Sequence, residues 1–508
     1  MSNINKINKA SYNSTINLVV YLVAVIAGIV KLKLVIFNYG NDFNSLYQFI
    51  AQMLSYMQLG NFGFTSLYLV YLYKSVVNQD KIEINKLLNG CKYFQKYSMI
   101  IMTVLTIIIS VLIPFIVTKS SFNNIYIIFS FVILSIPVIL EQYLNTNFII
   151  YQAKQINYKA GGLYSLARAF SLFFCAFLTF RLDIKQYIVF EVMLNSIIIV
   201  FFINYTSKYN KKFVGFTSEI DKRPTKLSFK YFLVRLSNVI IFGTDNIMLA
   251  RFVGLYSVGI VAPFVYISTV MTQIVSRLTA GIQNSLGIFL AEGNEGNGYA
   301  IKVIDLFLFF ISLAICIPTY FGMNIFVSEF FYSSGGYTNV QYLDISLVLI
   351  IFTRTAFYKF DLVINGVGLY NYSFFEKLIE AILNICLSYI LITSIGIAGV
   401  FIATSLSVVL ISLPINNYII KDYLHNSFLK TLLIDLTKII VLLILLYFVS
   451  ILRVNMDIYN LNLLITIFVI LLFAIIFLIV LFIIFFLFSK TFKNIFYSIL
   501  RRLQNKLK

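Results

Sequence analysis

Long apolar segments recur along the whole chain and limit what it can fold into. About fourteen stretches of roughly 18–28 residues are each long enough to cross a bilayer as an α-helix. Their predicted bounds are 17–38, 45–73, 94–118, 123–149, 161–180, 185–207, 229–252, 257–285, 301–327, 340–366, 375–394, 396–419, 433–452 and 461–489. The stretches are continuous runs, whereas an outer-membrane β-barrel shows short segments of alternating polarity. We therefore expect an all-α polytopic membrane protein with about fourteen transmembrane helices.

The composition excludes a large water-soluble enzyme. Hydrophobic residues make up 60% of the 508 residues and charged residues only 12%, against roughly 25% charged residues in a soluble domain. The formal net charge of +19 raises the question of a nucleic-acid partner. The cations, however, lie mostly in short loops between apolar segments, and no soluble basic domain is present to hold a duplex. We expect no nucleic-acid partner.

The positions of Lys and Arg predict the orientation in the membrane. The central loop "SKYNKKFVGFTSEIDKRPTK" (207–226) is dense in Lys and Arg, whereas the alternate loops carry only a few, such as Lys119 and Arg181. Cytoplasmic loops are enriched in Lys and Arg, so both termini are predicted to be cytoplasmic. The abundance of Asn, Lys, Ile, Phe and Tyr with no Trp suggests an AT-rich bacterial gene, so we expect the membrane to be a bacterial inner membrane. The basic tail (489–508) lies either along the inner leaflet as an amphipathic segment or in solvent as a plain flank.

The sequence offers no cofactor, metal or catalytic constellation. The four cysteines, Cys91, Cys175, Cys316 and Cys386, are far apart and form no CxxC pair, and His425 is the single histidine. No hydrolase motif is visible, and no loop carries an acid–base pair. We therefore expect no cofactor, no metal site and no enzymatic activity.

Two stretches suggest an internal repeat. "KLVIFNYGNDFNSLYQF" (33–49) and "IMLARFVGLYSVGIVAPF" (247–264) each contain an apolar segment, a glycine turn at Gly40 or Gly254, and a hydroxyl-rich restart. Both copies begin at the cytoplasmic side, which predicts a parallel repeat of two pseudo-symmetric six-helix lobes around a central cavity, followed by two additional helices. The predicted domains are an N-terminal lobe (1–207), a basic linker (208–228), a C-terminal lobe (229–420) and the last two helices with the tail (421–508).

Ionisable residues inside the predicted spans carry the functional information, because such residues usually face a bundle interior or a water-filled cavity. The cations are Lys31, Lys33, Arg168, Arg235, Arg277, Arg354 and Lys359, and the acids expected to couple or balance charge are Asp245 and Asp361. Cations outnumber acids in the first eight spans, so we expect a cavity that binds an anionic passenger. Arg277, Lys359 and Asp361 lie close to cytoplasmic span ends, where anchoring by snorkelling is an equal alternative.

The two lysines of "IVKLKLVIFNYG" (29–40) cannot both face one cavity. Helical residues are rotated by about 100° per position, so Lys31 and Lys33 point roughly 200° apart. One is expected to face inward and the other to snorkel toward the turn near Gly40. Either assignment fits the pattern.

The first hairpin carries a family resemblance. "KLKLVIFNYGNDFNSLYQFIAQMLSYMQLGNFGF" (31–64) resembles the N-terminal signature of the Wzx-type oligosaccharide flippases of the MATE/MOP superfamily, which also contains the MurJ lipid II flippases. The matching features are a cation at Lys31 or Lys33, Gly40, and the glycine-rich end at Gly60 and Gly63. The later stretch "TDNIMLARFVGLYSVGIVAP" (244–263) is similar to the family's acid–apolar–glycine pattern, with Asp245, Gly254 and Gly259 matching.

The resemblance implies a V-shaped, two-lobe transporter. Its passenger would be an undecaprenyl-diphosphate-linked oligosaccharide, moved to the outer leaflet for a surface polysaccharide such as the O-antigen of lipopolysaccharide. Cavity cations would bind the diphosphate and acidic sugars, with Lys31 or Lys33 the best match and Arg277 a looser one. H⁺ or Na⁺ would be coupling ions, and a polysaccharide polymerase a further partner.

Two other functions remain open. A MATE-like cation-coupled drug exporter predicts buried acids in the early spans, and the first two spans carry only Asp42, in the turn. A membrane polysaccharide polymerase predicts a sizeable periplasmic loop, which the sequence lacks.

Overall fold

The structure is a computed structural model that describes residues 3–154, 156–213, 215, 217–291, 297–332, 340–367, 370–424, 427–455, 463–494 and 497. Within these ranges the chain forms helices joined by short turns and contains no β-strand. The predicted all-α fold of a multi-pass membrane protein is confirmed. His425 and most of the basic tail lie outside the described residues.

Sixteen α-helices are described, together with short 3₁₀ or π turns. The helices are α1 (Asn3–Met57), α2 (Phe64–Val77), α3 (Lys81–Ile116), α4 (Asn124–Ala153), α5 (Gly161–Leu178), α6 (Ile184–Asn210), α7 (Ser228–Met248), α8 (Leu255–Ala291), α9 (Asn297–Phe331), α10 (Leu343–Ala356), α11 (Lys359–Val367), α12 (Tyr370–Ile395), α13 (Ile397–Ser407), α14 (Leu413–Leu424), α15 (Phe428–Asn455) and α16 (Leu463–Phe488). The turns used below are η1 (Gln58–Asn61), η4 (Arg223–Leu227), η5 (Leu249–Val253) and η6 (Val408–Ser412).

The chain divides into two compact units. Unit 1 comprises Met1–Ala262 and unit 2 comprises Pro263–Lys508, so that the division falls inside α8. The lobe and linker boundaries predicted at 207, 228 and 420 stay predictions.

The predicted count of about fourteen spans is not confirmed. In the described residues, 11 helices are long and apolar enough to cross a membrane, or 12 if the bent pair Arg235–Ile241 and Gly243–Val253 is one span. Two predictions account for the difference between fourteen and 12. The predicted first and second spans lie on one helical segment, Val19–Asn61. The predicted span 340–366 is divided into α10 and α11, which have only 14 and 9 residues.

The segment Val19–Asn61 nevertheless reverses its direction at Gly40. This residue is non-helical, with φ 80° and ψ 173°. Lys31 and Tyr47 would be about 24 Å apart on a straight helix, yet the Lys31 Nζ lies 2.7 Å from the Tyr47 Oη. The chain must therefore double back between them, and the turn predicted at Gly40 is present.

The return pass is itself broken, although the sequence predicts a continuous helix over 45–73. α1 ends at Met57, the 3₁₀ turn η1 follows, and Phe62 and Gly63 both adopt positive φ values of 49° and 68° before α2 begins. α3 passes very close to the break, because a Cβ on Gly60 would lie 2.9 Å from the Met102 Cγ. Glycines at this point allow both the close approach and the change of direction.

Buried amides satisfy the polar groups at this break. The Asn61 Nδ2 donates to the Gln142 Oε1 at 2.6 Å, and the Gln95 Nε2 donates to the side-chain oxygens of Asn61 and Gln142 at 3.3 Å each. The Ser98 hydroxyl donates to the Gly60 carbonyl at 2.7 Å. Backbone groups released from a helix in apolar surroundings need such partners, so α3 and α4 hold the break in place.

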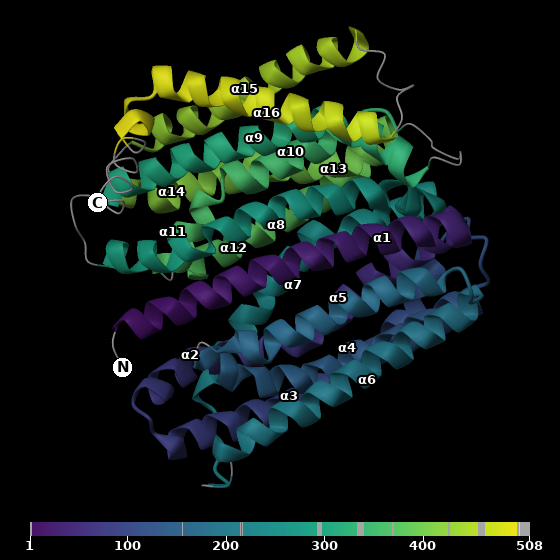
Figure 1. Ribbon diagram of the computed structural model, residues 1–508, viewed down its shortest axis with the longest axis vertical. Helices are drawn as coiled ribbons and strands as arrows, with labels where there is room; N and C mark the ends of the chain where they lie inside the picture. The colour runs from purple at the N-terminus through teal and green to yellow at the C-terminus, as the bar shows by residue number, and fades with distance from the viewer. Residues whose placement is uncertain are drawn as a thin grey trace. The chain divides into compact units, whose positions relative to one another are not determined.

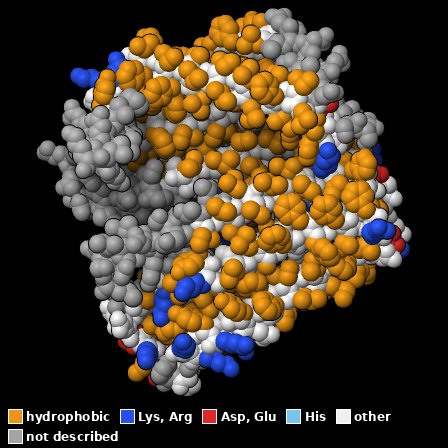
Figure 2. Space-filling view, viewed as in Figure 1, with side chains coloured by type: hydrophobic (Ala, Val, Ile, Leu, Met, Phe, Trp, Pro, Cys, Tyr) orange, Lys and Arg blue, Asp and Glu red, His pale blue; other side chains and the backbone are white. Residues whose placement is uncertain are grey.

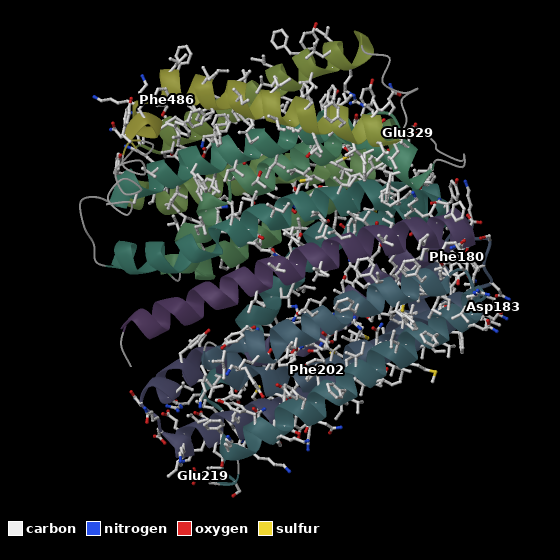
Figure 3. All side chains as sticks on the ribbon, viewed as in Figure 1. Phe180, Asp183, Phe202, Glu219, Glu329 and Phe486 are labelled. Carbon is white, nitrogen blue, oxygen red and sulfur yellow. The ribbon has the colours of Figure 1, made fainter. Side chains whose placement is uncertain are left out.

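Within unit 1, α4 packs against α3 and α6, and α5 packs against α1 (Figure 1). The core between α2, α3 and α4 includes Tyr68, Leu87, Leu144 and Ile150. Figure 3 shows Phe180 and Asp183 at one end of the unit and Glu219 at the opposite end. The loop before α6 and the linker after α6 therefore lie at opposite ends, as expected for a helix that crosses a membrane once.

The linker after α6 is bound to the ends of α2 and α3. The Tyr68 hydroxyl donates to the Asp221 carbonyl at 2.6 Å, and the Asp221 N–H donates to the Lys86 carbonyl at 3.2 Å. The Thr217 N–H donates to the Asn85 Oδ1 at 2.8 Å. This part of the linker is thus an ordered element of unit 1.

Within unit 2, α9 packs against α10, α15 and α16, and α12 packs against α13. Phe321 on α9 stacks on Phe473 of α16 with ring centroids 4.0 Å apart. Most other side chains of α16 are half-buried or exposed, in keeping with a helix that faces lipid. Figure 2 shows hydrophobic side chains covering most of the visible helix surface, with Lys and Arg gathered near helix ends.

Candidate substrate-binding regions

Lys31 lies in a buried ion pair inside unit 1. Its side chain donates to the Glu191 Oε1 of α6 at 2.5 Å and to the Tyr47 hydroxyl at 2.7 Å, and Tyr47 donates to the same Glu191 oxygen at 2.7 Å. The Lys31 Nζ also lies over the rings of Tyr47 and Tyr187, 4.5 and 5.9 Å from their centroids. Lys31 is 7% exposed and Glu191 is 4% exposed. The reversal at Gly40 makes this contact, because it returns Tyr47 to the depth of Lys31 along the pair of passes.

The Lys31 charge is therefore matched inside the unit. A buried ammonium needs both a counter-ion and hydrogen-bond acceptors, and Glu191 and Tyr47 supply them. The Glu191 Oε2 is buried without a hydrogen-bond partner in the described residues. Of the two lysines compared in the sequence, Lys31 faces the interior of unit 1, whereas Lys33 is half-buried.

One face of α5 continues this polar region. Tyr164, Arg168, Ser171 and Cys175 follow one another at helical spacing. The Tyr164 hydroxyl donates to the Glu141 Oε1 of α4 at 2.9 Å, and the Ser171 hydroxyl donates to the Asn195 Oδ1 of α6 at 3.2 Å. We call this set the α5 polar face.

Arg168 occupies the centre of the α5 polar face. Its guanidinium is within electrostatic reach of Tyr164 and Cys175, and the latter is also within reach of Lys31 and Glu191. The side chain is half-buried, and its Nη1 is buried with no hydrogen-bond partner in the described part of the chain. A planar guanidinium with an unused donor can bind an anion, and phosphate is among the anions that fit its geometry.

The other predicted residues of unit 1 lie on α7. Arg235 is half-buried, and Asp245 is 8% exposed and within electrostatic reach of Tyr56 on the return pass of α1. α7 approaches that pass closely, because a Cβ on Gly243 would collide with the Gln52 Nε2. Asp245 is thus placed beside α1, apart from the Lys31–Glu191 pair.

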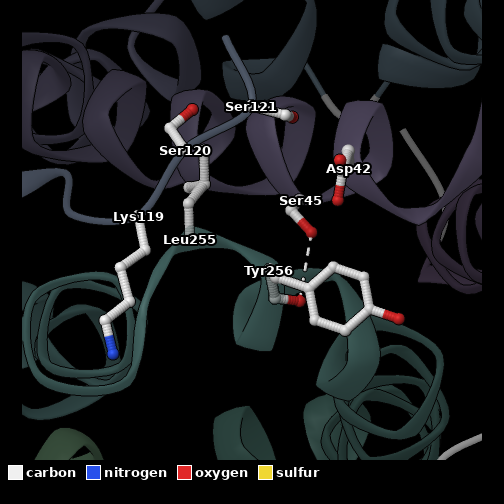
Figure 4. A pocket seen from close by; sticks show the side chains of 7 residues that line it. All are labelled: Asp42, Ser45, Lys119, Ser120, Ser121, Leu255 and Tyr256. Atoms are coloured by element: carbon white, nitrogen blue, oxygen red, sulfur yellow. Dashed lines mark hydrogen bonds between the residues drawn. The ribbon is translucent and has the colours of Figure 1, made fainter.

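A small polar pocket lies where the two glycine turns of the predicted repeat meet (Figure 4). Gly254 ends η5 at φ 125°, as Gly40 ends the first pass at φ 80°. The pocket has a volume of about 290 Å³ and is lined by Asp42, Ser45, Lys119, Ser120, Ser121, Leu255 and Tyr256. The Ser45 hydroxyl contacts the Tyr256 carbonyl at 3.2 Å. This volume is too small for a lipid-linked oligosaccharide.

In unit 2 the predicted residues differ in burial and in their surroundings. Arg277 on α8 is exposed, Arg354 on α10 is half-buried, and Asp361 on α11 is exposed. Lys359 is 4% exposed and donates to both carboxylate oxygens of Asp435 on α15 at 2.7 and 2.8 Å. It also lies 3.0 Å from Asp305 on α9.

Lys438 completes a buried charge quartet with Lys359, Asp305 and Asp435. Its Nζ donates to both carboxylate oxygens of Asp305 at 2.6 and 2.7 Å and to Asp435 at 2.8 Å. The quartet holds two cations and two acids, so it is neutral as a whole. The other three members were not predicted from the sequence, because acids and lysines near the ends of predicted spans resemble ordinary flanking charges.

A second group missed from the sequence lies on α12. Glu376 and Glu380 are each 1% exposed, and Lys377 lies between them in the sequence. Lys377 forms ion pairs with both glutamates, and Ser412 of η6 forms a hydrogen bond with Glu380. The signal was present as "EKLIE" (376–380) at the start of a predicted span, where it resembled a solvated helix end.

No family model and no curated protein sequence matches the chain. Among solved structures, a lipid II flippase MurJ in an inward closed conformation matches with a TM-score of 0.66, at 15% identity over 92% of this chain and 98% of the other. An inward-facing multidrug resistance MATE transporter of the MOP superfamily matches with a TM-score of 0.57, at 14% identity over 76% of this chain and 90% of the other. The MATE multidrug transporter DinF-BH matches with a TM-score of 0.55, at 13% identity over 83% of this chain and 97% of the other. The chain therefore has the fold that these flippase and multidrug transporter structures share.

Proposed function

We propose that the protein is a flippase that moves an undecaprenyl-diphosphate-linked oligosaccharide from the cytoplasmic to the outer leaflet of a bacterial inner membrane. The product would serve the assembly of a surface polysaccharide such as the O-antigen of lipopolysaccharide. The observation that carries the proposal is the fold. The lipid II flippase covers 92% of this chain, whereas the two multidrug transporters cover 76% and 83%. The larger share supports a lipid-linked passenger.

The charges of unit 1 support an anionic headgroup at one residue in particular. Lys31 is neutralised by Glu191, whereas Arg168 has an unused donor on its guanidinium. Arg168 is therefore our leading candidate for contact with the diphosphate. Lys33, Arg235, Arg277 and Arg354 stay proposed contacts, and Asp245 and Asp361 stay proposed charge-balancing groups. Lys359 is assigned to the buried quartet instead.

Transport needs no covalent chemistry, and we propose no enzymatic activity. H⁺ or Na⁺ is the proposed coupling ion, and a polysaccharide polymerase is a proposed partner that would receive the product. We also propose that both termini are cytoplasmic, because the linker 208–228, which would lie on the same side, is dense in Lys and Arg, whereas the alternate loops carry only a few.

A cation-coupled drug exporter is the second candidate. It is favoured by the shared fold and by the buried acids Glu191, Asp245 and Glu376, since a cationic drug needs negative charge in its path. The two functions differ in what their loss does. Loss of an exporter raises drug sensitivity and leaves the leaflet distribution of lipid-linked glycans unchanged.

The test is depletion of the protein followed by measurement of which leaflet of the inner membrane holds the lipid-linked glycan. The glycan should accumulate in the cytoplasmic leaflet, and wild-type protein should restore it to the outer leaflet. Arg168→Ala should fail to restore it, whereas Lys96→Ala, which removes an exposed lysine of α3, should restore it as wild type does.

The outcomes distinguish the proposed role of Arg168 from the proposed flippase function. Restoration by Arg168→Ala would leave the flippase in place and remove Arg168 from the path. The double variant Lys31→Ala/Lys33→Ala and Arg354→Ala, measured beside it at equal expression, test the remaining predicted cations. An unchanged leaflet distribution after depletion, in a strain without a second flippase, would contradict the proposed function and favour the exporter.

A further inference from the structure

Two buried carboxyl groups of unit 2 share one hydroxyl. Glu376 and Glu380 lie one turn apart on α12, and each is 1% exposed. The Ser412 Oγ is in hydrogen-bond contact with the Glu376 Oε1 and lies 2.5 Å from the Glu380 Oε2. Ser412 is the last residue of the π turn η6, whose wider helical turn brings this side chain to α12.

The hydrogen count at Ser412 favours a proton on one of the two acids. A serine hydroxyl carries a single hydrogen, so it donates at full strength to one carboxylate or shares that hydrogen between the two in a weaker three-centre contact. If the second carboxyl is protonated, it donates to the Ser412 oxygen, and both contacts become full hydrogen bonds. One protonated and one ionised carboxyl satisfy both contacts.

The charge balance leads to the same result. Lys377 is the single cation of the cluster, with its Nζ 2.8 Å from the Glu380 Oε2 and 3.2 Å from the Glu376 Oε1. Two ionised carboxylates beside one ammonium would leave an uncompensated buried negative charge, which is costly in apolar surroundings. A single bound proton neutralises the cluster.

The elements packed against α12 do not supply the missing positive charge within the described ranges. On α11, Asp361 is within electrostatic reach of Lys377 and Glu380, but its side chain is exposed and is not enclosed with the two buried glutamates. Lys359 is engaged by Asp305 and Asp435. On α14, the Lys421 Nζ lies over the ring of Tyr418 at 4.0 Å. α13 and η6 carry no charged residue.

Unused acceptors around the acids point to a ligand with hydrogen to donate. Asn416 is 5% exposed and donates its Nδ2 to the Glu376 Oε1 at 3.4 Å, while its Oδ1 has no hydrogen-bond partner in the described residues. The same is true of the Glu376 Oε2. A metal cation would need the space between the two carboxylates, and the Lys377 ammonium already contacts both. The geometry therefore favours H⁺ over Na⁺.

We propose that Glu376, Glu380 and Ser412 form a binding site for one exchangeable proton in unit 2. The proton is shared between the two carboxyl groups, and Lys377 sets the number bound at one. Its use as the coupling ion of transport rests on the proposed function, whereas the site itself does not.

The test is infrared spectroscopy of the purified full-length protein, which detects the C=O stretch of protonated carboxyl groups separately from ionised ones. Wild type should show a buried protonated-carboxyl band near neutral pH. Glu376→Gln and Glu380→Gln should each abolish it, because the remaining glutamate then forms a neutral pair with Lys377. Glu219→Gln, which changes a largely exposed glutamate of the linker, is the control, and it should retain the band.

Two more variants keep the test decisive if a glutamate variant does not fold. Lys377→Met removes the single cation, so both acids should bind a proton and the band should grow about twofold. Ser412→Ala should keep the band and shift its frequency, because a hydrogen bond to the carboxyl is lost. Absence of the band in wild type, or its insensitivity to all four changes on the cluster, would overturn the proposal.

Sodium and transport give separate readouts. Loss of the wild-type band on replacing choline chloride with NaCl at constant pH would show an alkali-cation site and overturn the proton assignment. The infrared band could behave as expected while depletion of the protein leaves the glycan distribution unchanged. That result would contradict the flippase function but support the proton site.

Discussion

At the scale of single residues, Lys31 and Glu191 show how a lysine is accommodated inside an apolar helix. Their contact joins positions 160 residues apart in the sequence and is reinforced by the Tyr47 hydroxyl. Neither charge is stable alone at such burial, because removing one partner leaves the other unpaired in low dielectric surroundings. The pair is therefore expected to behave as a unit.

Lys31→Met should cost about 3–5 kcal/mol of stability, because it leaves the Glu191 carboxylate buried without its counter-ion. The double variant Lys31→Met/Glu191→Gln should recover much of that loss. Thermal unfolding of the purified protein in detergent checks both, with Lys96→Met, at an exposed position of α3, as the control. A double variant no more stable than the single one would show that the pair does not act as a unit.

At the scale of elements, the buried quartet attaches α15 to the rest of unit 2. Lys438 and Asp435 lie on α15, Asp305 on α9 and Lys359 on α11, and Asn417 of α14 donates to Asp435 at 2.9 Å. In a membrane, apolar contact with lipid competes with apolar contact between helices, so polar contacts of this kind favour helix association. We expect the quartet to determine where α15 packs.

Lys438→Met should lower unit 2 stability by about 3–5 kcal/mol, because Asp305 and the fully buried Asp435 then share a single lysine. Lys430→Met changes an exposed lysine of the same helix and should leave the Tm unchanged. Adding Asp305→Asn to Lys438→Met should restore part of the loss, since it restores charge balance. Equal Tm values for the two single lysine variants would contradict a role of the quartet in docking α15.

The contact between the linker and α3 predicts that the stability of the linker, which lies outside the predicted spans, depends on pH. Burial alone would raise the pKa of Asp221, but hydrogen bonds from the Arg223 side chain and N–H, together with its charge, outweigh this and lower the pKa below its ordinary value of 3.8. A carboxyl with a lowered pKa stabilises the folded form above that ordinary value and loses this contribution as pH falls through the lowered pKa. Arg223 is largely exposed, so the effect is expected to be small.

Hydrogen exchange in residues 217–223 checks this expectation. Protection should fall in acid below pH 3.8, and Asp221→Asn should reduce protection already at neutral pH. Glu219→Gln, in the same linker but largely exposed, is the control and should change protection less. Unaltered exchange in Asp221→Asn would mean that the backbone contacts with Tyr68 and Lys86 hold the linker without the carboxylate.

At the scale of the whole molecule, the sequence predicts the class of fold because apolar runs of helical length specify membrane helices almost regardless of context. The Gly40 turn was also predictable, since a glycine followed by polar residues such as Asn41 and Asp42 interrupts such a run. The break in the helix at 58–63 could not be predicted, although Gly60 and Gly63 are visible in the sequence. The positive φ of Phe62 occurs beside amide side chains of α3 and α4, which are distant in the sequence.

The candidate residues were likewise predictable in position but not in their contacts. Sequence position identifies Lys31, Arg168 and Lys359 as charges inside spans, but their partners lie on helices distant in the sequence. Only the structure shows that Lys31 and Lys359 are neutralised by Glu191, Asp305 and Asp435. The unused donor of Arg168 likewise depends on which groups surround α5. We therefore expect fewer cations to be available to a passenger than the number of charges in the spans suggests.

The most direct test of the central claim is transport by the purified protein in liposomes. An undecaprenyl-diphosphate-linked oligosaccharide is placed in both leaflets, and an external glycosidase reports how much becomes accessible with time. The account predicts that wild type brings the inner-leaflet pool to the outside, that Arg168→Ala does so much more slowly, and that protein-free liposomes do not. The flippase account would be contradicted if liposomes with wild-type protein exposed no more glycan than protein-free liposomes and yet transported a cationic dye.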